Sequence, residues 1–183
     1  MISGLRKRAG QFVLGRNLRQ NKRGVRPISL AEVQSVLILV DIDKKEDFKA
    51  ALEYERYLKK EEGVRQVDIF GYTDKKELPE DLIAMANQFF LCRKDLNWLY
   101  LPTSKDVVKL FKSKHQLLID TSFEESFPIN FALAVSNANF KVGPKSKHHE
   151  QYLDFMIDMK DRPNVQMFFA QLNHFLNMFN RIQ

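Results

Sequence analysis

Short apolar runs alternate with longer segments of helical periodicity along most of the chain. The first run, SVLILVDI at residues 35–42, is continuously apolar, as is typical of a strand that is covered on both faces. Residues 45–63 follow with apolar positions at helical spacing and end at Gly63. Residues 164–182 carry a strong apolar stripe at i, i+3, i+4 and i+7 spacing, which predicts an amphipathic helix.

The same alternation predicts the remaining elements. The expected strands are residues 35–42, 64–73, 88–92, 116–122, 139–143 and 155–160. The expected helices are residues 45–63, 79–87 (beginning at Pro79), 104–114 (capped by Ser104), 128–137 and 164–182. Strands that alternate with helices indicate right-handed βαβ units. We therefore expect an α/β fold of the flavodoxin/Rossmann-like type: a three-layer sandwich with a mainly parallel five- or six-stranded sheet and the first strand central.

The positive charge of the chain is concentrated at its N-terminus. Eight cations and no acid precede Glu32, while the whole chain has a net charge of +6, so the remainder sums to −2. This divides the chain into a basic arm, residues 1–30, and a single α/β domain, residues 31–183. The arm is rich in glycine and poor in apolar residues, so we expect it to be mobile until a partner holds it, with a short helix forming on binding. Its cations are Arg6, Lys7, Arg8, Arg16, Arg19, Lys22, Arg23 and Arg26.

A run of cations without acids favours a polyanionic partner. Each phosphate that a Lys or Arg neutralises releases counterions, which gives salt-sensitive affinity that is largely independent of sequence. Arginines outnumber lysines six to two in the arm, which favours bidentate phosphate contacts. Our leading hypothesis is a non-catalytic RNA- or ribosome-associated protein, without DNA sequence specificity, whose domain faces a protein partner. The alternatives for the arm are a solubilising tail and an anchor to an anionic membrane, which would make the protein a membrane-peripheral interaction module.

Polar residues follow several of the expected strands. In open α/β sheets, ligands bind beyond the carboxyl ends of the strands, so these residues form a candidate ligand rim. The competing interpretation is that they cap helices and solvate loops; Asp43, for example, is expected to cap the next helix with Glu46 completing a capping box. The rim residues are Asp41, Asp43, Lys94, Asp95, Asn97, Trp98, Asp120, Thr121 and Ser122.

This rim is the basis of an alternative function, a small-molecule or Mg²⁺-dependent phosphoryl-transfer or hydrolase enzyme. In it, Asp41, Asp43 and Asp120 would be Mg²⁺ ligands or acid/base groups. The stretch LILVDIDKK resembles the first motif of haloacid-dehalogenase-like phosphatases, which implies a nucleophilic first Asp and an acid/base second Asp. Lys45 stands where that family has Thr or Val, which weakens the resemblance.

Other sites are excluded or disfavoured by the sequence. The glycine-rich loops of dinucleotide-binding and P-loop proteins are absent, and no nucleophile–base–orienter set is visible, so we predict no cofactor and no catalytic residues. Cys92 stands alone, which excludes a disulfide, and His148 and His149 are expected in a solvated loop rather than at a metal. No apolar run is long enough for a membrane span and no signal peptide is recognisable, so we expect a cytoplasmic protein.

Three stretches carry a family resemblance. They are KDLNWLYLP at residues 94–102, LLIDTSFEESFPINFALAVSNANFKVG at residues 117–143, and FMIDMK at residues 155–160. Together they resemble an uncharacterised Bacteroidota family of unknown function. The resemblance implies a small cytoplasmic bacterial α/β protein with a basic N-terminal lead, and it implies no reaction, cofactor or site residue.

Overall fold

The structure is a computed structural model that describes residues 2–159 and 164–179, with side chains described from residue 9 onward. Its strands are β1 (Ser35–Asp41), β2 (Gln66–Tyr72), β3 (Gln88–Leu91), β4 (Leu117–Asp120), β5 (Phe140–Pro144) and β6 (Phe155–Ile157). Its α-helices are α1 (Ile2–Gln20), α2 (Lys45–Lys60), α3 (Lys105–Lys112), α4 (Phe127–Val135) and α5 (Val165–Phe179). Two short 3₁₀ helices are η1 (Leu30–Glu32) and η2 (Arg93–Asp95).

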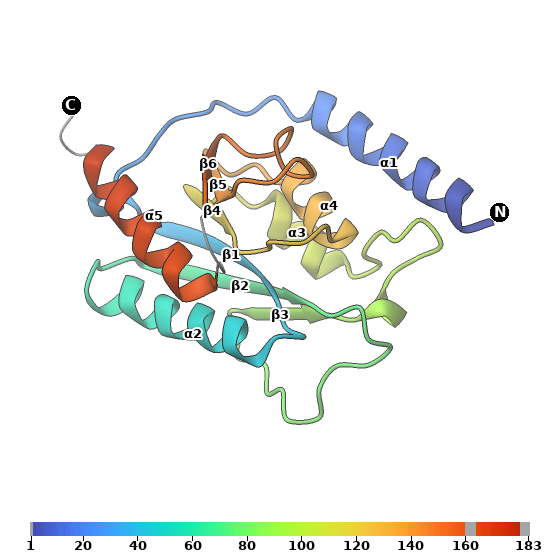
Figure 1. Ribbon diagram of the computed structural model, residues 1–183, viewed down its shortest axis with the longest axis horizontal. Coiled ribbons are helices and arrows are strands. Elements are labelled where there is room, and N and C mark those ends of the chain that lie inside the picture. The colour runs from blue at the N-terminus through green and yellow to red at the C-terminus, as the bar shows by residue number, and fades with distance from the viewer. Residues whose placement is uncertain (1, 160–163, 180–183) are drawn as a thin grey trace.

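The six strands form one open sheet in the order β3-β2-β1-β4-β5-β6, and each pair of neighbours is parallel. Helices α2 and α5 cover one face, and α1, α3 and α4 cover the other (Figure 1). Alternate residues of β1 face the two layers: Val36, Ile38 and Val40 pack toward α2 and α5, while Leu37 and Leu39 pack toward the other helices. The predicted α/β sandwich is thus confirmed, and burial on both faces explains why β1 is apolar throughout.

The strand order positions the candidate site. From β1 the chain proceeds outward to β2 and β3, then returns across the sheet through α3 to β4 on the other side of β1. The side of the sheet on which successive strands are added therefore changes between β1 and β4. At such a reversal the connections leave the carboxyl ends of the two strands on opposite faces, which opens a crevice between them.

One predicted helix is wrong. Residues 79–87 form a turn that Leu82 N closes on Pro79 O at 3.1 Å, and they lead directly into β3. Helices this short are stabilised mainly by burying an apolar face. In this segment only Leu82 packs against the core, while Ile83 is 85% exposed and Met85 is 68% exposed.

The N-terminal arm has a partner within the chain, which the sequence pattern did not predict. Residues 2–20 form α1, which lies against α4 (Figure 1). Leu14 is buried in the core on that face, and Gly10 lies so close to Phe127 that a β-carbon there would be 2.7 Å from its ring. The Asn21 side chain donates to the carbonyls of Ala134 and Ser136 at the end of α4, at 3.1 and 2.7 Å.

Within the described residues, no helix combines the length and the apolar character that crossing a membrane requires.

Candidate ligand pocket and nucleic-acid interface

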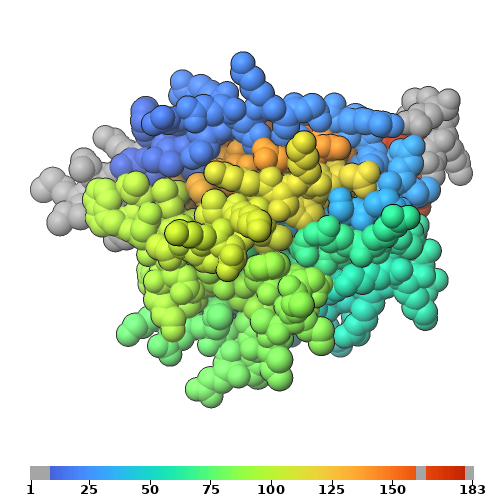
Figure 2. Space-filling model, turned by 180° about the vertical axis from the view of Figure 1, so that it is seen from behind, coloured from blue at the N-terminus to red at the C-terminus, as the bar shows by residue number. Residues whose placement is uncertain are grey.

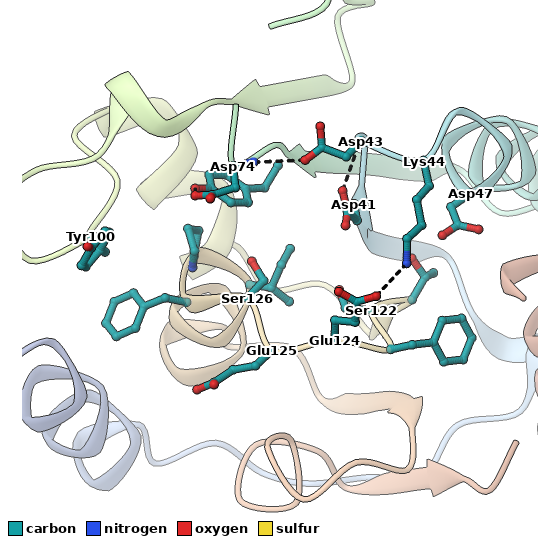
Figure 3. Close-up of a pocket in the computed structure, with 16 residues that line it drawn as sticks. Asp41, Asp43, Lys44, Asp47, Asp74, Tyr100, Ser122, Glu124, Glu125 and Ser126 are labelled. Atoms are coloured by element: carbon teal, nitrogen blue, oxygen red, sulfur yellow. Dashed lines mark hydrogen bonds and ion pairs between the residues drawn. The ribbon is translucent and has the colours of Figure 1, made fainter. Parts of the chain in front are cut away.

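A cavity of about 570 Å³ opens over the carboxyl ends of β1 and β4, at the reversal of strand order (Figure 3). The end of β1 and the start of α2 form one wall. The loop between β4 and α4, residues 121–126, together with the first turn of α4, forms another. The lining residues are Asp41, Asp43, Lys44, Asp47, Tyr72, Asp74, Tyr100, Thr121, Ser122, Phe123, Glu124, Glu125, Ser126, Phe127, Pro128 and Ile129.

Asp43 connects the loops that follow β1 and β2. Its Oδ1 accepts a hydrogen bond from Thr73 Oγ1 at 2.7 Å, its Oδ2 accepts one from Asp74 N at 3.3 Å, and Lys75 Nζ lies 3.0 Å away. Although partial burial opposes it, these partners, with Thr73 the strongest, hold the pKa of Asp43 below its ordinary value. The expected helix-capping role is wrong, because α2 has Lys44 at its N-cap position and no side-chain cap.

A negative charge is less favourable at Asp41 and Asp47 than at Asp43. Burial raises the pKa of Asp41, and the nearby Asp43 carboxylate raises it further. Burial likewise raises the pKa of Asp47, and Asp41 is among the carboxylates that add to the effect. Lys44 reaches across the cavity and pairs with Glu124 at 3.1 Å (Figure 3). The cavity is therefore acidic, and its own cation is already engaged.

The structure brings together four of the nine predicted rim residues. Asp41, Asp43, Thr121 and Ser122 line the cavity, and Thr121 Oγ1 ties the end of β4 to β1 by donating to Leu39 O at 2.9 Å. Because β1 and β4 are parallel neighbours, their carboxyl ends meet at one edge of the sheet.

The four rim residues that follow β3 serve local structure outside the cavity. Lys94 is exposed and lies 3.9 Å from Glu77. Asp95 accepts from Cys92 N at 2.9 Å, and Asn97 Oδ1 accepts from the backbone N–H of Leu99 at 2.8 Å. Trp98 is 55% exposed on the same loop. These residues turn the chain between β3 and α3, which places them away from the lining.

Asp120 lies beneath the cavity rather than in its lining. It is completely buried, and its Oδ1 accepts from Ser122 N at 3.0 Å. Its Oδ2 lies 3.1 Å from Nδ1 of His149, although the geometry falls short of a hydrogen bond. Burial raises the pKa of Asp120. The expectation of a solvated loop holds for His148, which is exposed, and is wrong for His149, which is 0% exposed.

A metal centre is not formed by these groups. Among the residues that the structure describes, no three or more His, Cys, Asp or Glu side chains are placed to hold a metal ion. In particular, Asp120 is separated from the cavity that Asp41 and Asp43 line. The Mg²⁺ set of the alternative hypothesis is therefore not brought together.

Sequence reasoning missed several lining residues. Lys44, Asp47 and Tyr100 were not among the predicted rim residues, nor were Glu124 and Glu125. Their positions in the chain were the available signal. The loop after β4 and the first turns of α2 and α4, the helices that follow β1 and β4, must border the same crevice. Tyr100 carried no such signal, since it reaches the cavity from the long loop after β3, where it adopts a left-handed backbone with φ of 61°.

The second candidate site is the outward surface of α1. Figure 2 shows the N-terminal segment, in blue, along one side of the molecule. Four of the predicted phosphate-binding residues are exposed: Arg16 and Arg19 lie on α1, and Lys22 and Arg26 lie in the segment that follows it. Arg6, Lys7 and Arg8 belong to the first half of α1, and their side chains lie outside the described residues.

Arg23 differs from the other cations of the arm. Its guanidinium forms an ion pair with Asp154 at 2.5 Å, with both side chains largely buried. It also donates to the carbonyl of Ala138 at 3.1 Å. In this arrangement Arg23 fastens the arm to the domain, and it is not presented to an external phosphate.

Comparison with known proteins gives a family match. The model of a family of unknown function, DUF6913, matches residues 6–179. No curated protein and no solved structure matches the chain. The match extends from α1 to the end of α5, so the arm belongs to the matched region together with the sheet.

Proposed function

Because this chain belongs to DUF6913, a family of unknown function, we propose its function from its own surface: it is a non-catalytic RNA-binding protein that associates with a ribonucleoprotein such as the ribosome through α1. The docked helix presents a basic face to the RNA backbone, and the α/β domain holds that face in place. The domain itself is left to contact protein.

The observation that carries this proposal is the two-sidedness of α1. Gly10, Leu14 and Leu18 recur at every fourth residue and pack toward the core, so they form one stripe of the helix. Arg16 and Arg19 are exposed on the opposite stripe. The helix thus separates a docking face from a face of free cations, as an anchored polyanion-binding element requires.

Phe12 adds a second kind of contact on the same outward stripe. It is 70% exposed, and it precedes Arg16 by one helical turn. An aromatic ring one turn before an arginine can stack on an unpaired base while the guanidinium groups bind phosphates. This combination favours single-stranded or looped RNA over a regular duplex.

Holding α1 on the domain also lowers the entropy lost on binding. The Arg23–Asp154 pair and the Asn21 hydrogen bonds fix the C-terminal end of the arm on the domain. Side chains presented by a fixed helix need less ordering when they bind than those of a mobile tail.

The test is fluorescence anisotropy with a labelled single-stranded RNA over a series of salt concentrations. The variant Arg16→Gln/Arg19→Gln should weaken binding and lower the slope of log K against log salt by about 1.4, since each lost phosphate contact contributes roughly 0.7 on a single strand. The matched control, Lys49→Gln/Lys60→Gln, removes the same charge from exposed positions of α2 on the other face of the sheet and should bind like the parent protein.

Two results would overturn the proposal. One is an equal loss of RNA affinity in both double variants, which would show that the effect depends only on net charge. The other is binding to vesicles that contain anionic lipid without measurable binding to RNA, which would make α1 a membrane anchor.

A further inference from the structure

We propose that the cavity over β1 and β4 binds a small organic cation, a molecule with an ammonium or guanidinium group on an apolar frame. This site is distinct from the outward face of α1 and does not depend on RNA binding. Its volume of about 570 Å³ falls within the range of roughly 300–1,000 Å³ that is typical of small-molecule sites. Its position at the reversal of strand order is where open α/β sheets bind ligands.

The charge of the lining selects the class of ligand. Six carboxylates line the cavity against one lysine. Four of them have a cationic or histidine partner: Asp43 with Lys75 at 3.0 Å, Glu124 with Lys44 at 3.1 Å, Asp74 with Arg93 at 3.8 Å and Glu125 with His148 at 3.9 Å. Asp41 and Asp47 have no ion-pair partner among the described residues. These two leave uncompensated negative charge in the cavity.

The position of Lys44 shows how an ammonium fits between these carboxylates. Its side chain passes between Asp41 and Asp47 before its Nζ meets Glu124 (Figure 3). The Lys44 pKa is raised, first by Glu124 and further by Asp47 and Asp41. The site therefore already stabilises the ammonium of Lys44. Because that ammonium pairs with Glu124, a ligand amine would bind to Asp41 and Asp47, which have no ion-pair partner in the part of the chain that the structure describes.

The rest of the lining suits the frame of such a ligand. Tyr72, Phe123 and Phe127 supply aromatic surface, and a cation over an aromatic face gains further attraction. Ser122 lines the cavity as well, although its buried Oγ presents no surface to a ligand.

Other ligand classes fit less well. An anion would meet six carboxylates, which outweigh the partial positive charge at the N-termini of α2 and α4. A metal ion needs converging ligands, and no such group occurs among the described residues. An organic cation tolerates spread carboxylates, because its amine contacts one part of the site while its frame contacts another.

The test is isothermal titration calorimetry of the full chain with putrescine, spermidine, agmatine and choline, each at moderate salt. At least one probe should bind, and Asp41→Asn/Asp47→Asn should weaken it at least tenfold. We expect this variant to fold, because burial disfavours the charge of both aspartates and Asn removes that charge. Glu46→Gln is the matched control, since Glu46 is exposed beside Asp47 and outside the lining; it should bind like the parent.

Three outcomes would overturn the proposal. They are binding of none of the four probes at millimolar concentration, equal weakening by Glu46→Gln, and tighter binding of inorganic phosphate or Mg²⁺ than of every cationic probe. Because RNA binding is measured with α1 variants that leave the cavity intact, failure here and failure of the RNA proposal are distinguishable.

Discussion

Lys141 on β5 is a lysine whose charge the fold opposes. It is 1% exposed, and its Nζ donates a hydrogen bond of 2.5 Å to Leu133 O in the last turn of α4. That carbonyl has no partner within its own helix, so Lys141 caps α4 from the neighbouring strand. Burial, with the charge of Arg23 adding to it and that of Asp154 opposing it, lowers the pKa of Lys141 from 10.5 to about 7.

This shift sets the size and sign of a pH effect on stability. A fall of roughly 3.5 units corresponds to about 5 kcal/mol between the protonation states. Above pH 7 the folded chain releases the proton while the unfolded chain keeps it until about pH 10.5. Since the unfolded state then binds more protons, the contribution of Lys141 to the free energy of unfolding rises with pH, by about 1.4 kcal/mol per unit.

The perturbation is Lys141→Met, which keeps the length of the side chain and removes the titration. At pH 7 the variant should be more stable than the parent by a few kcal/mol, after about 1 kcal/mol is subtracted for the lost hydrogen bond. Urea unfolding of both proteins at pH 7.5 and 9.5 should show this advantage shrinking by about 2.5 kcal/mol. Lys112→Met, at an exposed position of α3, should show no such trend. An advantage that stays constant with pH would refute the reasoning.

Three further predictions concern packing, each measured by urea unfolding. Leu14→Ala should lower the free energy of unfolding by about 2–4 kcal/mol because Leu14 is 3% exposed under α1, and an unchanged value would mean that the arm does not dock. Ser104→Ala should cost about 1 kcal/mol, since the hydroxyl accepts from Val107 N at the start of α3; no loss would show that water replaces the cap. Gly71→Ala should cost about 1–3 kcal/mol, because the new β-carbon would lie 2.6 Å from Ile42 Cγ2 and 2.7 Å from the Phe90 ring, and a neutral result would show that both side chains move aside freely.

The strands were predictable because their signal is strong and local. A strand buried on both faces must be apolar at nearly every position, and SVLILVDI meets that condition over the whole of β1. The helices with a wide apolar stripe, α2 and α5, were predictable for the same reason. Residues 79–87 contain five apolar residues, but only Leu82 finds a surface to pack against, and that depends on the positions of β2 and β3 rather than on local sequence.

The site was predictable only in outline. Strand ends identified Asp41 and Asp43, because the end of an apolar run is visible in the sequence. The sequence did not show that Ser122 would line the cavity while Asp120 would not. That difference depends on the loop after β5, which brings His149 close to Asp120. The docking of α1 was hidden for a similar reason: its stripe of Gly10, Leu14 and Leu18 is too narrow to stand out beside eight cations.

The near-neutral charge of the domain conceals a separation of charge. Arg16 and Arg19 are exposed on α1, while six carboxylates line a cavity whose lining includes Phe127, the residue against which Gly10 packs. The docking face of α1 thus borders the cavity, and the exposed cations of the helix and the carboxylates of the cavity form two surfaces of opposite sign. If both proposals hold, a polyanion bound along α1 would be repelled by the carboxylates of the cavity, and a small cation held in the cavity would be repelled by the cations of α1. In that case each surface would disfavour the ligand of the other, which would keep the proposed RNA contact and the proposed small-molecule site apart within one small domain.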